Sequence, residues 1–312
     1  MEPKSEKVKF GSQEIGWHVW QQHTDDDDAA ATGPLIILFH GFLAHGRYPT
    51  VRYAAELCAT HLAGCTVVAA DMPGHGTSDG LRGYLSGAPG LVTNFGCQVL
   101  ATARQKYDPQ GQRKVFLMGS SMGGTIALQV ALAEPPTTTP SSSSSIAGVV
   151  LLAPMLKLNV STLEAYALQG LAALVPTWQI IPSSSTSAEK QYRDADKRAA
   201  CETDALAIQG SKIRVGSAWT CVQLARTILP TAGVGNDDVS SRWTQFPVWN
   251  GVADQDVVVD KQGSFELDTM IREAGGSSTM VVYPALHGLL CEPPPLFDQI
   301  TNDILKWIKE RL

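Results

Sequence analysis

A serine flanked by glycines, between a strand-like run and a helix-like run, constrains this chain more than any other feature. Residues 119–123 read GSSMG, after the apolar run 114–118 and before the helix-like run 125–133. This is the pattern of a tight strand-to-helix turn that exposes a serine hydroxyl above a sheet, and glycines allow the helix and the strand to approach closely. The spacing selects Ser121, because a GxSxG pattern centred on Ser120 would need glycines where Met118 and Met122 stand.

Apolar runs of strand length recur along the chain and alternate with helical segments. They lie at residues 35–39, 66–70, 114–118, 147–153, 246–250 and 279–283. Runs that are apolar throughout, rather than alternating, are typical of a parallel sheet that helices cover on both faces. Residues 7–10 and 14–20 flank a Gly-Ser turn and mix polar with apolar residues, which predicts an antiparallel hairpin at the sheet edge.

The strand pattern stops after Pro154 and returns near residue 236. The sequence therefore predicts a core at residues 1–154 and 236–312, with a helical cap inserted at residues 155–235. Within the cap, apolar residues recur at helical spacing at Leu163, Tyr166, Ala167, Leu171 and Leu174, and residues 176–182 form a kinked apolar stretch between prolines. Such a helix packs on the core, or it also presents an apolar face to a membrane surface. Amphipathicity alone leaves both interpretations open.

Composition narrows the classes of function. A net charge of −6 argues against nucleic-acid binding, which requires a basic patch. No apolar run reaches the roughly eighteen residues of a membrane span, and the first residues lack the apolar segment of a signal peptide. We therefore expect a cytoplasmic protein, with peripheral membrane association through the cap as the open alternative. The six cysteines have neither a CxxC pair nor zinc-site spacing, so we expect them to be reduced and structural, with no bound metal.

Three further segments are predicted to be loops without a ligand. Four consecutive aspartates at residues 25–28 and the Ser/Thr/Pro-rich run 135–145 have the composition of solvated surface loops. The glycine-rich segment 71–80 follows a strand but lacks the lysine of a phosphate-binding loop. It therefore predicts a structural loop beside the site, and no nucleotide or other cofactor is expected.

A serine hydroxyl needs a base to remove its proton and a carboxylate to orient that base. Asp254, Asp256 and Asp260 lie in the loop after the run 246–250, where ligand sites of open α/β sheets form. We predict Asp254 as the acid and keep Asp256 as the alternative, while Asp260 is placed to cap the following helix. His287 follows the last strand and is the one histidine of seven that completes the order Ser, Asp, His.

An acyl-transfer site also needs two N–H groups for the oxyanion of the tetrahedral intermediate. Met122 follows the serine and supplies the first. Phe42, in the HGF loop after the run 35–39, is predicted to supply the second. His40 and Gly41 are then expected to be structural, through loop hydrogen bonds and small volume.

Together these segments resemble the monoacylglycerol lipase group of α/β-hydrolases, particularly the branch that includes lysophospholipases and caffeoylshikimate esterases. The resemblance rests on HGF at 40–42, DMPGHGTSDG at 71–80, GSSMGG at 119–124, LLAPMLKL at 151–158, PTWQIIP at 176–182, GVADQDVV at 251–258 and YPALHGLL at 283–290. It implies an α/β-hydrolase fold with a mostly parallel eight-stranded sheet, helices on both faces and a mobile helical cap over an acyl tunnel.

The resemblance also implies a serine hydrolase with Ser121, Asp254 and His287 as catalytic triad and Phe42 and Met122 at the oxyanion hole. The predicted reaction is hydrolysis of monoacylglycerols to fatty acid and glycerol, without a cofactor. Lysophospholipids and hydroxycinnamoyl esters are alternative substrates, and a ligand receptor of the same fold with little turnover is the alternative from another class.

The chain departs from the family pattern in two places. Ser120 stands where relatives carry a larger polar residue, and the oxyanion loop is one residue shorter than in the animal lipases. His45 and Arg47 of that loop are candidates for holding a polar head group. The shortening leaves their placement and the head-group preference open.

Overall fold

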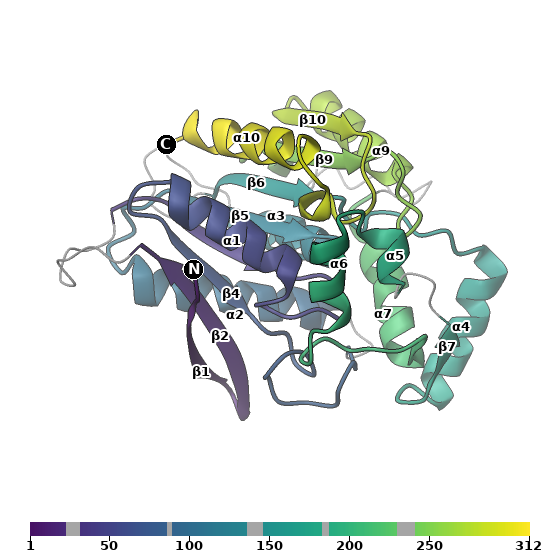
Figure 1. Ribbon diagram of the computed structural model, residues 1–312. Coiled ribbons are helices and arrows are strands. Elements are labelled where there is room, and N and C mark those ends of the chain that lie inside the picture. The colour runs from purple at the N-terminus through teal and green to yellow at the C-terminus, as the bar shows by residue number, and fades with distance from the viewer. Residues whose placement is uncertain (23–31, 86–88, 136–145, 183–186, 230–240) are drawn as a thin grey trace.

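An eight-stranded sheet forms the centre of the protein (Figure 1), with the strand order β1-β2-β4-β3-β5-β6-β9-β10. The computed structural model describes residues 1–22, 32–85, 89–135, 146–182, 187–229 and 241–312. The strands are β1 Lys4–Phe10, β2 Gln13–Gln21, β3 Leu35–Phe39, β4 Thr66–Ala70, β5 Val115–Ser120, β6 Ile146–Leu152, β9 Val248–Ala253 and β10 Ser278–Tyr283. β1 and β2 form the predicted antiparallel hairpin, β2 is also antiparallel to β4, and the remaining pairs are parallel. The predicted fold class is confirmed.

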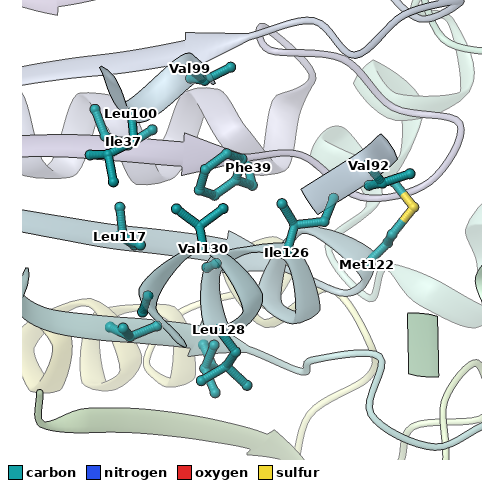
Figure 2. Close-up of a cluster of buried hydrophobic side chains, with 14 of the residues drawn as sticks. Ile37, Phe39, Val92, Val99, Leu100, Leu117, Met122, Ile126, Leu128 and Val130 are labelled. Carbon is teal, nitrogen blue, oxygen red and sulfur yellow. The ribbon is translucent and has the colours of Figure 1, made fainter. Parts of the chain in front are cut away.

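Helices cover both faces of this sheet. One apolar cluster joins the sheet to α1 Pro49–His61 and α10 Leu296–Lys309, and the other joins it to α2 Pro89–Tyr107, α3 Met122–Ala133 and α9 Gln262–Glu273. Successive residues of β3 alternate between the two clusters, so that Ile36 packs on one side and Ile37 on the other. Figure 2 shows Ile37, Phe39 and Leu117 of the sheet beside side chains of α2 and α3. Burial on both faces is why these strands are apolar throughout.

The segment between β6 and β9 contains the elements of the predicted cap. They are α4 Thr162–Leu174, β7 Gln179–Pro182, α5 Ala188–Gln191, α6 Ala195–Glu202, β8 Lys212–Arg214 and α7 Val215–Ala225. The 3₁₀ turn η2 Ser241–Thr244 follows beyond the predicted cap, before β9. α7 packs on α2 and α3 of the core, and α4 packs on α7. The insertion also contains a short antiparallel pair, β7 with β8, which the predicted helical cap did not include. Two β-branched isoleucines enclosed by Pro176 and Pro182 favour a short extended segment over a helix.

Some predictions fall on parts of the chain that the structure does not describe. These are the loop at residues 25–28, all but the first residue of the loop at 135–145, and the cap boundary near residue 235. Within the described residues, no helix is both long enough and apolar enough to cross a membrane.

Candidate active site

Ser121 lies on the strained turn between β5 and α3. Its backbone has φ 54° and ψ −122°, a conformation that residues other than glycine rarely adopt. The turn is held by the Ser121 N–H donating to the Leu152 carbonyl and by the Ser121 carbonyl accepting from Met155. Glycine is required around it, since a Cβ on Gly123 would lie 2.0 Å from the Phe39 carbonyl oxygen. The predicted strand-to-helix turn is confirmed.

His287 lies in the loop after β10 and is paired with Asp256. The imidazole Nδ1 is 2.7 Å from the Asp256 Oδ2, and the two side chains are only 5% and 2% exposed. The second carboxylate oxygen of Asp256 accepts from the backbone N–H groups of Val258 and Val259, at 2.7 and 3.1 Å. Because an ionised carboxylate only accepts, Nδ1 carries the proton and Nε2 is left as the acceptor.

The structure does not pair His287 with Asp254, so that prediction was wrong. The Asp254 side chain is 53% exposed and lies 2.5 Å from the Lys261 ammonium nitrogen. The Asp254 backbone N–H donates to the Tyr283 carbonyl of β10, which continues the pairing of the two strands. The chain turns after Asp254, where the Asp256 N–H donates to the Ala253 carbonyl. The alternative, Asp256, is therefore the carboxylate that contacts His287.

Ser121 and His287 line one cavity of about 660 Å³ between the core and the cap. Its apolar lining includes Met155, Leu158, Val160, Leu168, Ile181, Ile213, Val222 and Val259, and its polar lining includes Tyr48, Glu189, Gln191, Tyr192 and Glu202. In the described part of the chain, no hydrogen bond joins the Ser121 hydroxyl to the His287 ring. Such contacts often tighten only when substrate binds.

The two predicted oxyanion donors both lie near Ser121. Met122 is the first residue of α3, so its N–H has no acceptor within the helix. Phe42 lines the cavity, and a Cβ on its neighbour Gly41 would lie 3.5 Å from the Ser121 Cβ. Within the described residues, neither N–H has a backbone acceptor. Both donors are thus available for a ligand oxygen, and their assignment to an oxyanion hole stays a prediction.

His40 supports the loop that carries Phe42. Its Nε2 accepts from the Met72 N–H at 3.0 Å, and its Nδ1 donates to the Gly41 carbonyl at 2.8 Å. Burial lowers the pKa of His40 to about 4, which keeps the ring neutral and able to play both parts at neutral pH. The structural role predicted for His40 agrees with these contacts.

Asp71 joins this loop to the segment 71–80 and was not singled out from the sequence. Its buried carboxylate accepts from the Gly46 N–H at 2.6 Å and from the N–H and hydroxyl of Thr77, at 2.8 and 2.9 Å. Burial alone would raise the pKa of Asp71, but the contacts with His18 and Thr77 outweigh burial and lower it. The buried charge fixes the loops around the site.

His45 does not line the cavity, contrary to its candidacy for head-group binding. Its Nε2 is 3.0 Å from the Asp204 Oδ1, so it links the core loop to the cap. Arg47 is also absent from the described cavity lining. The loop shortening does not bring either residue to the cavity. Among the described residues, no cluster of three histidine, cysteine or carboxylate side chains is suited to a metal ion.

Known proteins resemble this chain in sequence and in fold. The sequence model of the family described as "Serine aminopeptidase, S33" matches residues 31–294. The chain is 27% identical to the monoglyceride lipase of Homo sapiens over 89% of its length and 82% of the relative's. It is 26% identical to the caffeoylshikimate esterase of Arabidopsis thaliana, over 80% of this chain and 70% of that one. A solved structure of a soluble variant of monoglyceride lipase from Saccharomyces cerevisiae, in complex with a substrate analog, superposes with a TM-score of 0.77 at 16% identity, covering 100% of this chain and 96% of that one.

Proposed function

Because this chain belongs to the serine aminopeptidase S33 family of α/β-hydrolases, we propose that it hydrolyses the ester bond of monoacylglycerols, with Ser121 as nucleophile. The observation that carries the proposal is the buried His287–Asp256 pair, which shares one largely apolar cavity with the serine on the strained turn. The similarity to monoglyceride lipases from several organisms supports the choice of substrate.

The reaction proceeds in two steps through an acyl-enzyme. The His287 Nε2 takes the Ser121 proton as the hydroxyl attacks the acyl carbonyl, and then returns it to the departing glycerol oxygen. Asp256 holds the imidazole in the required tautomer and stabilises its cation. The N–H groups of Phe42 and Met122 stabilise the oxyanion, and the loss of one such donor typically costs about 3–4 kcal/mol of transition-state stabilisation. Water then releases the fatty acid by the same path.

The charge of the cavity favours a neutral head group. Glu189 and Glu202 line it, and no lysine or arginine does so within the described residues. An anionic lysophospholipid would bring a phosphate and a shikimate ester a carboxylate, and either anion would be repelled by these carboxylates. Glycerol carries no charge. The lining therefore supports a monoacylglycerol over the two alternative esters.

The cap also presents an apolar surface that we propose to contact membranes. Leu163 and Leu174 at the two ends of α4 are 79% and 80% exposed, and Tyr166 and Trp178 are 69% and 59% exposed. Apolar side chains gathered on one exposed element are typical of a surface that binds protein or lipid. The proposed substrate is a lipid ester that reaches the cavity from a membrane. A lipid surface is therefore the partner that fits this exposed apolar surface.

Sedimentation with phosphatidylcholine vesicles tests the membrane contact. The double variant L163S/L174S is expected to lose most of the vesicle-bound fraction, while L91S, which removes a leucine 54% exposed on α2, keeps it. Hydrolysis of a water-soluble p-nitrophenyl ester is expected to be the same in all three proteins. Equal vesicle binding by wild type and the double variant would refute the contact.

A panel of esters tests the proposed activity. Purified wild type is assayed on monoacylglycerol, the anionic lysophosphatidylglycerol, caffeoylshikimate and a p-nitrophenyl ester, next to S121A and S120A. We expect monoacylglycerol to be the best substrate, S121A to be inactive and unlabelled by a fluorophosphonate, and S120A to remain active. Rapid labelling of wild type with negligible turnover of every ester would instead indicate a receptor, and full activity of S121A would overturn the assignment of the nucleophile.

A further inference from the structure

Two cysteines far apart in the chain meet where the cap joins the core. Cys201 lies in the last turn of α6, and Cys291 ends the 3₁₀ turn η3 Leu289–Cys291, directly after the loop that carries His287. Both are buried, with 1% and 0% exposure, and they share a small cluster with Tyr192. The two side chains are close enough for one thiol to hydrogen-bond the other.

Hydrogen bonds to backbone carbonyls hold the two sides of this junction together. The Asp194 N–H at the start of α6 donates to the Cys291 carbonyl at 3.0 Å. The Lys197 ammonium donates to the carbonyls on either side of Cys291, those of Leu290 and Glu292, at 3.2 and 3.0 Å. The two sulfur atoms are therefore held near each other by bonds that do not involve the thiols.

The two thiols differ in access and in reactivity. Cys201 lines the cavity that also contains Ser121, whereas Cys291 does not belong to the lining. The hydrogen bond with Cys291 lowers the pKa of Cys201, and the same bond raises the pKa of Cys291. Because the thiolate is the nucleophile, a small oxidant that enters the cavity meets the more reactive sulfur first.

We propose that Cys201 and Cys291 are a modification site at which a peroxide forms a reversible disulfide. The Cys201 thiolate attacks one peroxide oxygen, the O–O bond breaks, hydroxide leaves, and the sulfur is oxidised by two electrons to a sulfenic acid. The Cys291 sulfur then attacks the Cys201 sulfur, the S–O bond breaks, and the sulfenic oxygen leaves as water with the Cys291 proton. A dithiol reductant restores both thiols.

The bond would link α6 of the cap to the loop that carries His287. That loop has no free space toward the cap, since a Cβ on Gly288 would lie 2.4 Å from the Tyr192 Cδ1. The Gly288 N–H also donates to the Gln191 carbonyl at 2.8 Å. Any shift of α6 on closing the disulfide is passed to the imidazole, so oxidation is expected to slow ester hydrolysis. This inference concerns the thiols and holds whichever ester the enzyme prefers.

The test uses the full chain, reduced, desalted and treated with graded hydrogen peroxide. We expect wild type to lose two of its six thiols, to yield a Cys201–Cys291 cross-linked peptide on mapping without reductant, and to lose most of its p-nitrophenyl esterase rate. Dithiothreitol is expected to restore both thiols and rate. C97S, which changes a half-buried cysteine outside the pair, is expected to form the same cross-link.

C201S and C291S separate the disulfide from other oxidation, with each variant compared to its own reduced sample. Both are expected to keep their rate under the peroxide concentration that inhibits wild type, and circular dichroism checks their fold. If either variant is unfolded, the wild-type peptide map alone decides. Sulfinic acid at Cys201 without a cross-link, or a cross-link between other cysteines, would overturn the site. A complete disulfide with unchanged turnover would overturn its link to catalysis.

Discussion

Two carboxylates of one loop, Asp254 and Asp256, make opposite kinds of contact. Asp256 is buried, with one oxygen on His287 and the other on two backbone N–H groups, whereas Asp254 is exposed and pairs with Lys261. An exposed pair of this kind contributes at most about 1 kcal/mol to stability. The buried acid, in contrast, determines which ring nitrogen of His287 carries the proton.

D256N and D254N are the matched test of this difference. We expect D256N to lower kcat about 10³- to 10⁴-fold, because an amide can leave the imidazole in the wrong tautomer and does not stabilise its cation. D254N is expected to stay within about twofold of wild type, since it disturbs only an exposed ion pair. The measurement is kcat on monoacylglycerol at neutral pH. A larger loss in D254N than in D256N would restore Asp254 as the acid.

The identity of the acid shows where prediction from sequence ends at this scale. The order Ser, Asp, His and the strand before each residue were enough to identify Ser121 and His287 as candidates. The choice between Asp254 and Asp256 depends on one reverse turn, in which the Asp256 N–H donates to the Ala253 carbonyl. Both aspartates follow the strand equally well in sequence, so the pattern contains no signal for that turn.

Gly123 is a second residue whose role rests on close approach. A Cβ there would meet the Phe39 carbonyl oxygen at 2.0 Å, so G123A forces β3 and α3 apart. We expect a loss of about 1–3 kcal/mol in the free energy of unfolding, as for other overpacked sites, together with a large loss of activity.

G170A is the control for Gly123. It makes the same substitution inside α4, where a new Cβ meets nothing within 4 Å. A gain of about 0.5–1 kcal/mol is expected there, from helix propensity. Urea unfolding of both variants gives the comparison, and wild-type stability in G123A would contradict the close packing at the turn.

At the scale of elements, one buried arginine links the strand ends on the side of the sheet away from the site. The Arg113 guanidinium donates to the carbonyls of Gly33, Pro34, Gly64 and Tyr107 and to the Thr66 hydroxyl, at 2.6 to 3.1 Å. Arg113 is only 9% exposed. It therefore joins the entrances to β3 and β4 with the end of α2.

R113K is expected to lower the free energy of unfolding by about 2–4 kcal/mol, because lysine keeps the charge but cannot bond all these acceptors, and buried unpaired carbonyls cost about 1–3 kcal/mol each. R272K makes the same change at a side chain 58% exposed, where a loss below about 1 kcal/mol is expected. Chemical denaturation of both proteins measures the difference. Equal losses of unfolding free energy in R113K and R272K would show that the positive charge, rather than the several N–H donors of the guanidinium, stabilises this region.

Elements were predictable from the sequence where their burial is regular. β3, β4 and β5 are buried on both faces, so that their apolar runs are uninterrupted and easily found. β7 and β8 are short, with β7 largely exposed and β8 only half-buried, so they leave no such pattern. β8 does not contain an apolar run at all. Their pairing depends on the fold of the cap and could not be predicted locally.

In the whole molecule, the sheet could be predicted from the sequence, whereas the contacts between cap and core and among the buried polar groups could not. The hairpin, the parallel strands and the order of the site loops follow from patterns along the chain. The bonds that join cap and core, such as His45 to Asp204, connect residues far apart in sequence and have no local signature. The same holds for the buried polar groups under the oxyanion loop, where Asp71 and His75 lie beside His40.

These buried groups make the stability of the whole protein depend on pH. Burial lowers the pKa of His40 to about 4 and that of His75 to about 3, from an ordinary value near 6.5. Asp71 and Arg82 also act on His75, and burial outweighs the favourable effect of Asp71. At a pH between the ordinary pKa of histidine and the lowered pKa of the folded state, the unfolded chain binds protons that the folded chain does not. Acidification therefore favours unfolding.

The free energy of unfolding is therefore expected to fall as the pH drops from about 6.5 to about 4, by up to about 1.4 kcal/mol per pH unit for each of the two histidines. Below that window the lowered pKa of Asp71 continues the same trend, because its stabilising charge is lost only as the pH falls further. Urea unfolding at pH 7, 6 and 5 measures the slope, and H75Q, which removes one of the two groups, is expected to reduce it by about half. A free energy of unfolding that stays constant or rises between pH 6 and 5 would mean that His40 and His75 take up protons in the folded state. A protonated His40 could not accept the Met72 N–H, the hydrogen bond that holds the loop in place.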